Sequence, residues 1–135
     1  PANHHLYFNN EHLVTDSTTT LLSIDSATYK NGSEVMQYIR SFNVPTQNMN
    51  RTRHTRLQLD CEAGVGATTP EITLKWSDDG AHTFNDGLTT SLGTTGEYSK
   101  RVVWHRLGMT KGQPRVYELS GASDSKVVLI NVHLD

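Results

Sequence analysis

The stretch Trp76-Ser-Asp-Asp-Gly-Ala-His-Thr-Phe84 is the clearest structural signal in this sequence. Apolar residues alternate with polar ones up to Trp76, as on one face of a β-strand. Gly80 allows the positive φ that a tight turn requires. Ser77 and Asp79 carry short polar side chains that hydrogen-bond backbone amides inside turns. We therefore expect two short strands joined by a turn that its own side chains hold closed.

The same stretch matches a recognised turn motif. Its residues fit the pattern Ser-x-Asp-x-Gly-x-Thr-aromatic at Ser77, Asp79, Gly80, Thr83 and Phe84. The pattern resembles the Asp-box, which occurs in sialidases and many other β proteins. No second copy is present in the sequence. The motif therefore predicts a stabilised turn, and by itself it does not indicate a glycosidase.

The two adjacent carboxylates of the motif do not form a catalytic pair. Neighbouring residues of a strand point to opposite faces, so Asp78 and Asp79 cannot both flank one glycosidic bond. We interpret Asp79 as the residue that ties the turn and Asp78 as a solvated turn residue. No catalytic residue is predicted in this chain.

The rest of the chain also has the pattern of short strands. No long window holds apolar residues at helical spacing, and threonine, valine and glycine-bounded runs are frequent. A hairpin turn is expected at Lys30-Asn-Gly-Ser33 and a flexible loop over 87–96. Further strands are expected over residues 21–29, 35–44, 55–62, 98–107, 115–119 and 126–134, the last two forming a pair. These signals predict an all-β fold, a jelly-roll-like β-sandwich of about eight short antiparallel strands.

The predicted domain organisation is simple. Residues 1–20 are polar and threonine-rich and are expected to be an N-terminal arm or strand. Residues 21–135 are expected to form a single β-sandwich domain, which agrees with the chain length. The sequence begins at Pro1, which fits either a trimmed initiator methionine or a fragment of a longer protein, and we expect a fragment.

Alternation within the strands predicts which side chains form the core. Leu57, Leu59 and Cys61 share one parity, so Cys61 is expected to be a buried, inert thiol. Trp76 and Trp104 are each in phase with apolar neighbours and are also assigned to the core. Tyr98 follows a glycine-containing loop and is the residue that we expect at an interface between proteins.

Composition and charge narrow the classes of function. The net charge is −2, which does not indicate a nucleic-acid-binding domain, and no apolar run is long enough to insert into a membrane. One cysteine excludes an internal disulfide and a cysteine-rich metal site. The seven histidines show no metal-binding spacing, and His4-His5 is expected to be disordered. We predict no metal and no cofactor.

Two basic clusters are the remaining candidate sites. Arg51 and Arg53 share one strand face, and Arg56 lies on the other. Their guanidinium groups could contact phosphates of passing DNA, or they could be solvated or pair with acidic groups of a neighbouring subunit. The same alternatives apply to the basic residues around Trp104, which are Lys100, Arg101 and Arg106.

Several segments in order resemble one protein family. They are Arg53-His-Thr-Arg-Leu-Gln-Leu-Asp-Cys-Glu-Ala-Gly-Val-Gly66, Pro70-Glu-Ile-Thr-Leu-Lys-Trp-Ser-Asp-Asp-Gly80, Gly96-Glu-Tyr-Ser-Lys-Arg-Val-Val-Trp-His-Arg-Leu-Gly108 and Arg115-Val-Tyr-Glu-Leu-Ser120, with Ser91-Leu-Gly93 between the second and third. Over about residues 50–135 the chain resembles the C-terminal region of the packaged DNA stabilization proteins of short-tailed bacteriophages.

The resemblance implies a structural protein of the virion tail. Such proteins form a homo-oligomeric ring below the portal and its adaptor, close the channel over packaged DNA and help to form the conduit for ejection. It implies other tail and portal-adaptor proteins as partners and no catalytic site. Two alternatives stay open at this point: a carbohydrate-binding or sialidase-like Asp-box module, and an autonomous β interaction domain.

Overall fold

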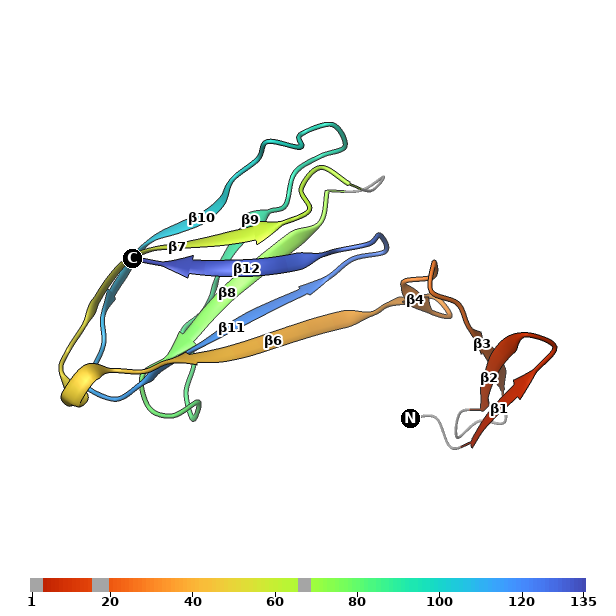
Figure 1. Cartoon of the computed structure of the whole chain (residues 1–135), viewed down its shortest axis with the longest axis horizontal. Helices are drawn as coiled ribbons and strands as arrows, with labels where there is room; N and C mark the ends of the chain where they lie inside the picture. The colour runs from red at the N-terminus through yellow and green to blue at the C-terminus, as the bar shows by residue number, and fades with distance from the viewer. Residues whose placement is uncertain (1–3, 16–19, 66–68) are drawn as a thin grey trace.

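The computed structural model describes residues 4–15, 20–65 and 69–135. The fold is all-β, as predicted, and its larger part is a sandwich of two packed sheets (Figure 1). The part of the chain described by the model contains no helix long and apolar enough to cross a membrane.

The sandwich consists of a four-stranded and a three-stranded sheet, and all neighbouring strands in both are antiparallel. The first sheet has the order β6 (Gln37–Val44), β11 (Arg115–Ala122), β8 (Glu71–Ser77) and β9 (Leu88–Ser91). The second has the order β10 (Val102–Met109), β7 (Arg53–Cys61) and β12 (Leu129–Leu134).

The chain crosses from one sheet to the other at nearly every connection. Among the described strands of the sandwich, β8 and β9 are the only consecutive ones that pair, and the hairpin between them contains the Asp-box residues. The prediction that the last two strands pair is wrong, because β11 lies between β6 and β8 while β12 pairs with β7. Because the two sheets pack face to face, one face of each strand is buried between them.

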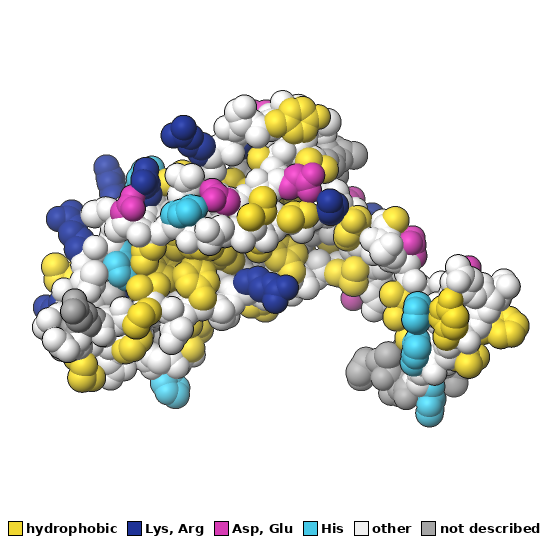
Figure 2. Space-filling model, viewed as in Figure 1, with side chains coloured by type: hydrophobic (Ala, Val, Ile, Leu, Met, Phe, Trp, Pro, Cys, Tyr) yellow, Lys and Arg dark blue, Asp and Glu magenta, His cyan; other side chains and the backbone are white. Residues whose placement is uncertain are grey.

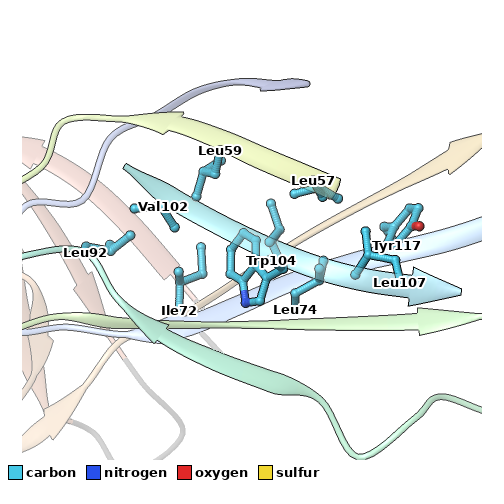
Figure 3. Close-up of a cluster of buried hydrophobic side chains, with 10 residues drawn as sticks. Leu57, Leu59, Ile72, Leu74, Leu92, Val102, Trp104, Leu107 and Tyr117 are labelled. Atoms are coloured by element: carbon cyan, nitrogen blue, oxygen red, sulfur yellow. The ribbon is translucent and has the colours of Figure 1, made fainter. Parts of the chain in front are cut away.

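The core lies between the two sheets and centres on Trp104 (Figure 3). Leu57 and Leu59 extend from β7, and Ile72 and Leu74 face them from β8. Trp104 is 4% exposed, and its indole N–H donates to the carbonyl of Leu88 at 2.8 Å. The predicted core parity is therefore correct for these strands, and Cys61 and Trp76 pack partly buried against the same cluster.

A separate three-stranded sheet precedes the sandwich (Figure 1). Its strands are β1 (His4–Phe8), β2 (Glu11–Thr15) and β3 (Leu21–Ile24), joined in sequence order. Asn9 and Asn10 both have positive φ and form the two-residue turn between β1 and β2. The expectation of disorder at His4-His5 is wrong, because both residues belong to β1. Residues 1–3 and 16–19 of the predicted arm lie outside the described residues.

The chain between the N-terminal sheet and the sandwich differs from the prediction. The strand expected over residues 21–29 ends at Ile24, where the Asp25 carboxylate accepts the amide of Ala27 and begins a turn. It pairs with β2 and not with β6. The expected hairpin turn is present but small, between β4 (Lys30–Asn31) and β5 (Glu34–Val35). A short 3-10 helix, η1 (Gln47–Met49), then connects β6 to β7.

Candidate functional site

The Asp-box turn is held by Asp79 and Ser77. One carboxylate oxygen of Asp79 accepts the hydroxyl of Ser77 at 2.5 Å and the amides of His82 and Thr83 at 3.1 and 2.9 Å. The other accepts the hydroxyl of Thr83 at 2.5 Å. The Ser77 hydroxyl and then the Thr83 contacts hold the pKa of Asp79 far below its ordinary value. Gly80 has a φ of 73° and the Phe84 side chain is half-buried, so all five motif residues take part in one closed turn.

Asp78 is not the solvated turn residue that the sequence suggested. Its two carboxylate oxygens accept Nε and Nη2 of Arg115 at 2.7 and 2.8 Å, in the bidentate geometry of strong ion pairs. The Arg115 side chain is only 2% exposed. It lies 5.7 Å from the ring centroid of Trp76 and 5.9 Å from that of Tyr117. Asp78 therefore neutralises a cation buried in the sandwich.

Arg115 also satisfies backbone carbonyls at the end of β10. Its Nη1 donates to the carbonyl of Leu107 at 2.6 Å, and its Nη2 donates to that of Met109 at 3.0 Å. Burial opposes the charged form, but the hydrogen bond to Asp78 and the other contacts outweigh it and raise the pKa of Arg115. The sequence held a signal for this residue, because Arg115 is in phase with Tyr117 and Leu119 on the buried face of β11. A buried arginine requires a carboxylate partner.

A buried histidine lies beside this ion pair. The Nδ1 atom of His54 is 2.7 Å from the hydroxyl of Tyr117, and His54 is 4% exposed. Burial, and then the positive charge of Arg115, lower the pKa of His54, so its imidazole is neutral at neutral pH. His54 thus acts as a hydrogen-bonding core residue.

A β-bulge in β7 changes the faces on which the predicted arginines lie. The amides of Thr55 and Arg56 both donate to the carbonyl of Asp135, at 2.7 and 3.3 Å. Two residues thus oppose one, which reverses the alternation. His54 is buried before the bulge and Leu57 after it, so Arg53 and Arg56 both remain exposed on the outer face. The assignment of these two arginines to opposite faces is therefore wrong.

A second bulge lies directly across the sheet in β10. The pairing of β10 with β7 shifts between His105 and Gly108, and Arg106 there has a φ of 62°. Between the two bulged segments is a pocket of about 700 Å³ lined by Arg53, His54, Thr55, His105, Arg106 and Gly108. Figure 2 shows lysine and arginine side chains concentrated at this end of the sandwich, near the start of β7 and the end of β10.

The other predicted contact residues are dispersed. Arg51 is exposed just before β7, and Arg56 forms an ion pair of 2.5 Å with the carboxylate of Asp135. Tyr98 is 71% exposed in the loop before β10, where Lys100 lies 3.9 Å from Glu97. Of the described arginines in the first predicted cluster, Arg53 alone lines the pocket. Arg106 lines it from the second cluster.

Comparison with protein families gives the sandwich its identity. Residues 39–135 match the family described as bacteriophage P22 Gp10, beta-sandwich. The chain belongs to this family. A search of curated proteins found no match. The matched region begins within β6 and covers the other six strands of the sandwich in full, while the N-terminal sheet lies before it.

Membership in the P22 Gp10 family makes this chain a structural protein of a short-tailed bacteriophage virion, located in the tail. The family is a structural β-sandwich and not a known enzyme family. As a virion protein of this family, the chain interacts with other virion proteins.

The chemistry of the described residues gives no support to a sialidase-like site. Asp79 is occupied by its own turn and Asp78 by Arg115, so neither carboxylate of the motif is placed to act on a sugar. Within residues 4–15, 20–65 and 69–135, no group of three histidine, cysteine or acidic side chains could hold a metal ion. Burial raises the pKa of the Cys61 thiol, which disfavours the reactive thiolate.

Proposed function

We propose that this chain helps to close the portal channel, to stabilise packaged DNA and to form the conduit through which the genome is ejected. The observation that carries the proposal is the match of residues 39–135 to the P22 Gp10 family. The partners would be other tail proteins and the portal adaptor, with several copies of the full-length protein arranged in a ring.

The physical properties of the sandwich suit a component that must resist deformation. The Asp79 turn and the Asp78–Arg115 pair tie the β8–β9 hairpin to itself and to β10. Side chains that fix loops in this way reduce local unfolding. A protein that closes a channel against internal pressure would need this resistance. Because β3 pairs with β2, the domain division that we propose places residues 21–24 with the N-terminal sheet and not with the sandwich.

The N-terminal sheet and Tyr98 are the surfaces that we propose for contacts with neighbouring proteins. Leu6, Phe8 and Leu21 are 60, 66 and 63% exposed, and Tyr98 is 71% exposed. Exposed apolar side chains gathered on one small element commonly mark interaction surfaces. In the ring, these side chains would be covered by an adjacent copy or by another tail protein.

The proposal is tested in a phage that lacks the protein, complemented with the full-length protein or with a version in which residues 39–135 are deleted. We expect heads filled without the sandwich to release DNA that nuclease can digest, and electron microscopy to show incomplete tails. Full-length protein should restore both. Heads that keep their DNA and carry complete tails without the sandwich would contradict the proposal.

A further inference from the structure

The pocket at the paired bulges has an unusual charge arrangement. Arg53 of β7 and Arg106 of β10 are among the residues that line it. Among the described residues neither of these arginines forms an ion pair, although Arg56 nearby is neutralised by Asp135. The described residues that line the pocket include no carboxylate. Two arginines without an ion pair among the described residues thus lie at one concave site.

The backbone that carries Arg106 is held in a conformation that an arginine rarely adopts. A φ of 62° in a residue other than glycine costs about 1–2 kcal/mol, and such strain persists only when the surroundings enforce it. Here the next carbonyl, of Leu107, accepts Nη1 of Arg115, and the carbonyl of Met109 accepts Nη2. Arg115 is in turn fixed by Asp78 of the Asp-box hairpin. The hairpin therefore positions one wall of the pocket through a single buried arginine.

We propose that this pocket binds a phosphate group, with Arg53 and Arg106 as its two guanidinium contacts and Arg115 as the residue that positions Arg106. The proposal rests on the proposed function for the source of the phosphate, which is the backbone of DNA passing the tail ring. The sequence suggested Arg51, Arg53 and Arg56 as a DNA contact. The proposed contact consists instead of Arg53 from β7 and Arg106 from β10.

Two arginines fit a phosphate, and the proposed function favours it over a carboxylate of a neighbouring protein. One guanidinium fork can bind either group through two hydrogen bonds. A phosphodiester has two non-bridging oxygens and can accept from a separate guanidinium on each. Of the other polar side chains that line the pocket, Thr55 donates to the carbonyl of Asp135 and His54 contacts Tyr117, which leaves His105 as a further polar group of the wall. A net charge of −2 keeps such a contact weak, which suits DNA that must pass and not be retained.

The first experiment uses the complete chain with inorganic phosphate and with a short DNA duplex as probes. Inorganic phosphate should shift the NMR amide signals of residues 53–55 and 105–108 more than those elsewhere. Duplex binding, followed by fluorescence anisotropy across a salt series, should weaken with salt. Replacing Arg53→Gln or Arg106→Gln should each lower the slope of log affinity against log salt by about 1.

Matched variants separate this site from general charge and from loss of folding. Arg101→Gln removes an exposed arginine outside the pocket and should leave the salt slope unchanged. Arg106→Gly removes the guanidinium and relieves the positive φ, so it should reduce duplex binding while the thermal midpoint stays equal or rises. Asp78→Asn should reduce duplex binding less than Arg106→Gln, because it acts only through Arg115.

Three results would overturn the proposal. One is that neither phosphate nor duplex shifts the signals of the pocket. Another is that Arg101→Gln weakens duplex binding as much as the pocket variants. The third is that the pocket variants change the sedimenting mass of the protein but not its duplex binding, which would assign the pocket to a carboxylate of a neighbouring copy. All three can occur while the phage still needs the protein to retain DNA, so they are distinct from failure of the proposed function.

Discussion

The sandwich and the N-terminal sheet are built from the same kind of strand but differ in what covers them. Leu57, Ile72 and Leu74 of the sandwich are 0% exposed, because a second sheet packs on the face that they share. Leu6 and Phe8 of the N-terminal sheet are 60 and 66% exposed, and no second layer covers them within the described residues. Backbone pairing alone makes a sheet, but a domain requires two layers. Among the described residues, the N-terminal sheet therefore lacks the second layer that buries the apolar face of the sandwich.

Removing the buried ion pair between Asp78 and Arg115 should lower the free energy of unfolding far more than removing a polar contact of the N-terminal sheet. Arg115→Met leaves the Asp78 carboxylate unpaired and two carbonyls without a donor, which should lower the free energy of unfolding by about 3–5 kcal/mol. Glu11→Gln changes only an exposed contact with Ser23 and should alter the free energy of unfolding by less than about 0.5 kcal/mol. Urea unfolding of both variants measures these two free-energy changes. Equal effects would mean that the pair does not hold the sandwich together.

Apolar truncation tests the comparison directly. Leu74→Ala creates a cavity between the sheets and should cost about 2–5 kcal/mol of unfolding free energy. Phe8→Ala removes a larger side chain that is already in solvent and should cost less than about 0.5 kcal/mol in the isolated chain. Guanidinium unfolding monitored by tryptophan fluorescence reports on the sandwich, and circular dichroism reports on both regions. A large cost for Phe8→Ala would show that the N-terminal sheet already has a covering surface.

Close packing at Gly121 should give an intermediate effect. A Cβ built at this position contacts the Tyr38 hydroxyl on β6 and lies 2.8 Å from the carbonyl oxygen of Glu71. Gly121→Ala should therefore displace β6 from β11 and cost about 1–3 kcal/mol. Ser23→Ala in β3, which lies in an exposed position, should be nearly neutral. Thermal melting of the two variants provides the test, and a neutral Gly121→Ala would mean that Tyr38 moves aside freely.

The smallest expected effect is a pH dependence that belongs to the sandwich alone. Because the pKa of His54 is lowered in the folded state, the unfolded chain takes up a proton first as the pH falls below about 6.5. Stability should decline from there to the lower pKa of the folded state and not beyond it. Thermal midpoints recorded from neutral to mildly acidic pH should fall in the native chain and less in His54→Asn. The exposed-histidine variant His82→Asn should keep the native profile; a flat native profile would contradict the assignment.

Local patterns predicted the strands well and their partners poorly. Alternation placed Leu57, Leu59 and Trp104 in the core, where they lie. The loop expected over residues 87–96 contains β9, whose Leu88–Ser91 segment has too little hydrophobic alternation to be recognised. Its strand conformation comes from pairing with β8 and from the cross-strand contact between Thr73 and Thr89 at 2.9 Å. Tertiary context overrides weak β propensity in this way.

The candidate site was only partly visible in the sequence for a similar reason. Arg53 was recognised because it lies in a dense basic run. Arg106 could not be joined to it, because the two are brought together by pairing between strands separated by the whole Asp-box hairpin. The role of Asp78 was missed because its partner, Arg115, is 37 residues away along the chain.

Sequence alone established the properties that depend on near neighbours in the chain. These are the strand-rich pattern, the turn tied by Asp79, the core parity on each side of that turn and the resemblance to phage tail proteins. Only the tertiary structure decided which strands pair, where Asp78 directs its carboxylate and how the two bulges combine Arg53 with Arg106. Turn hydrogen bonds and alternation act within a few residues, whereas strand order and buried ion pairs depend on which distant segments exclude water together.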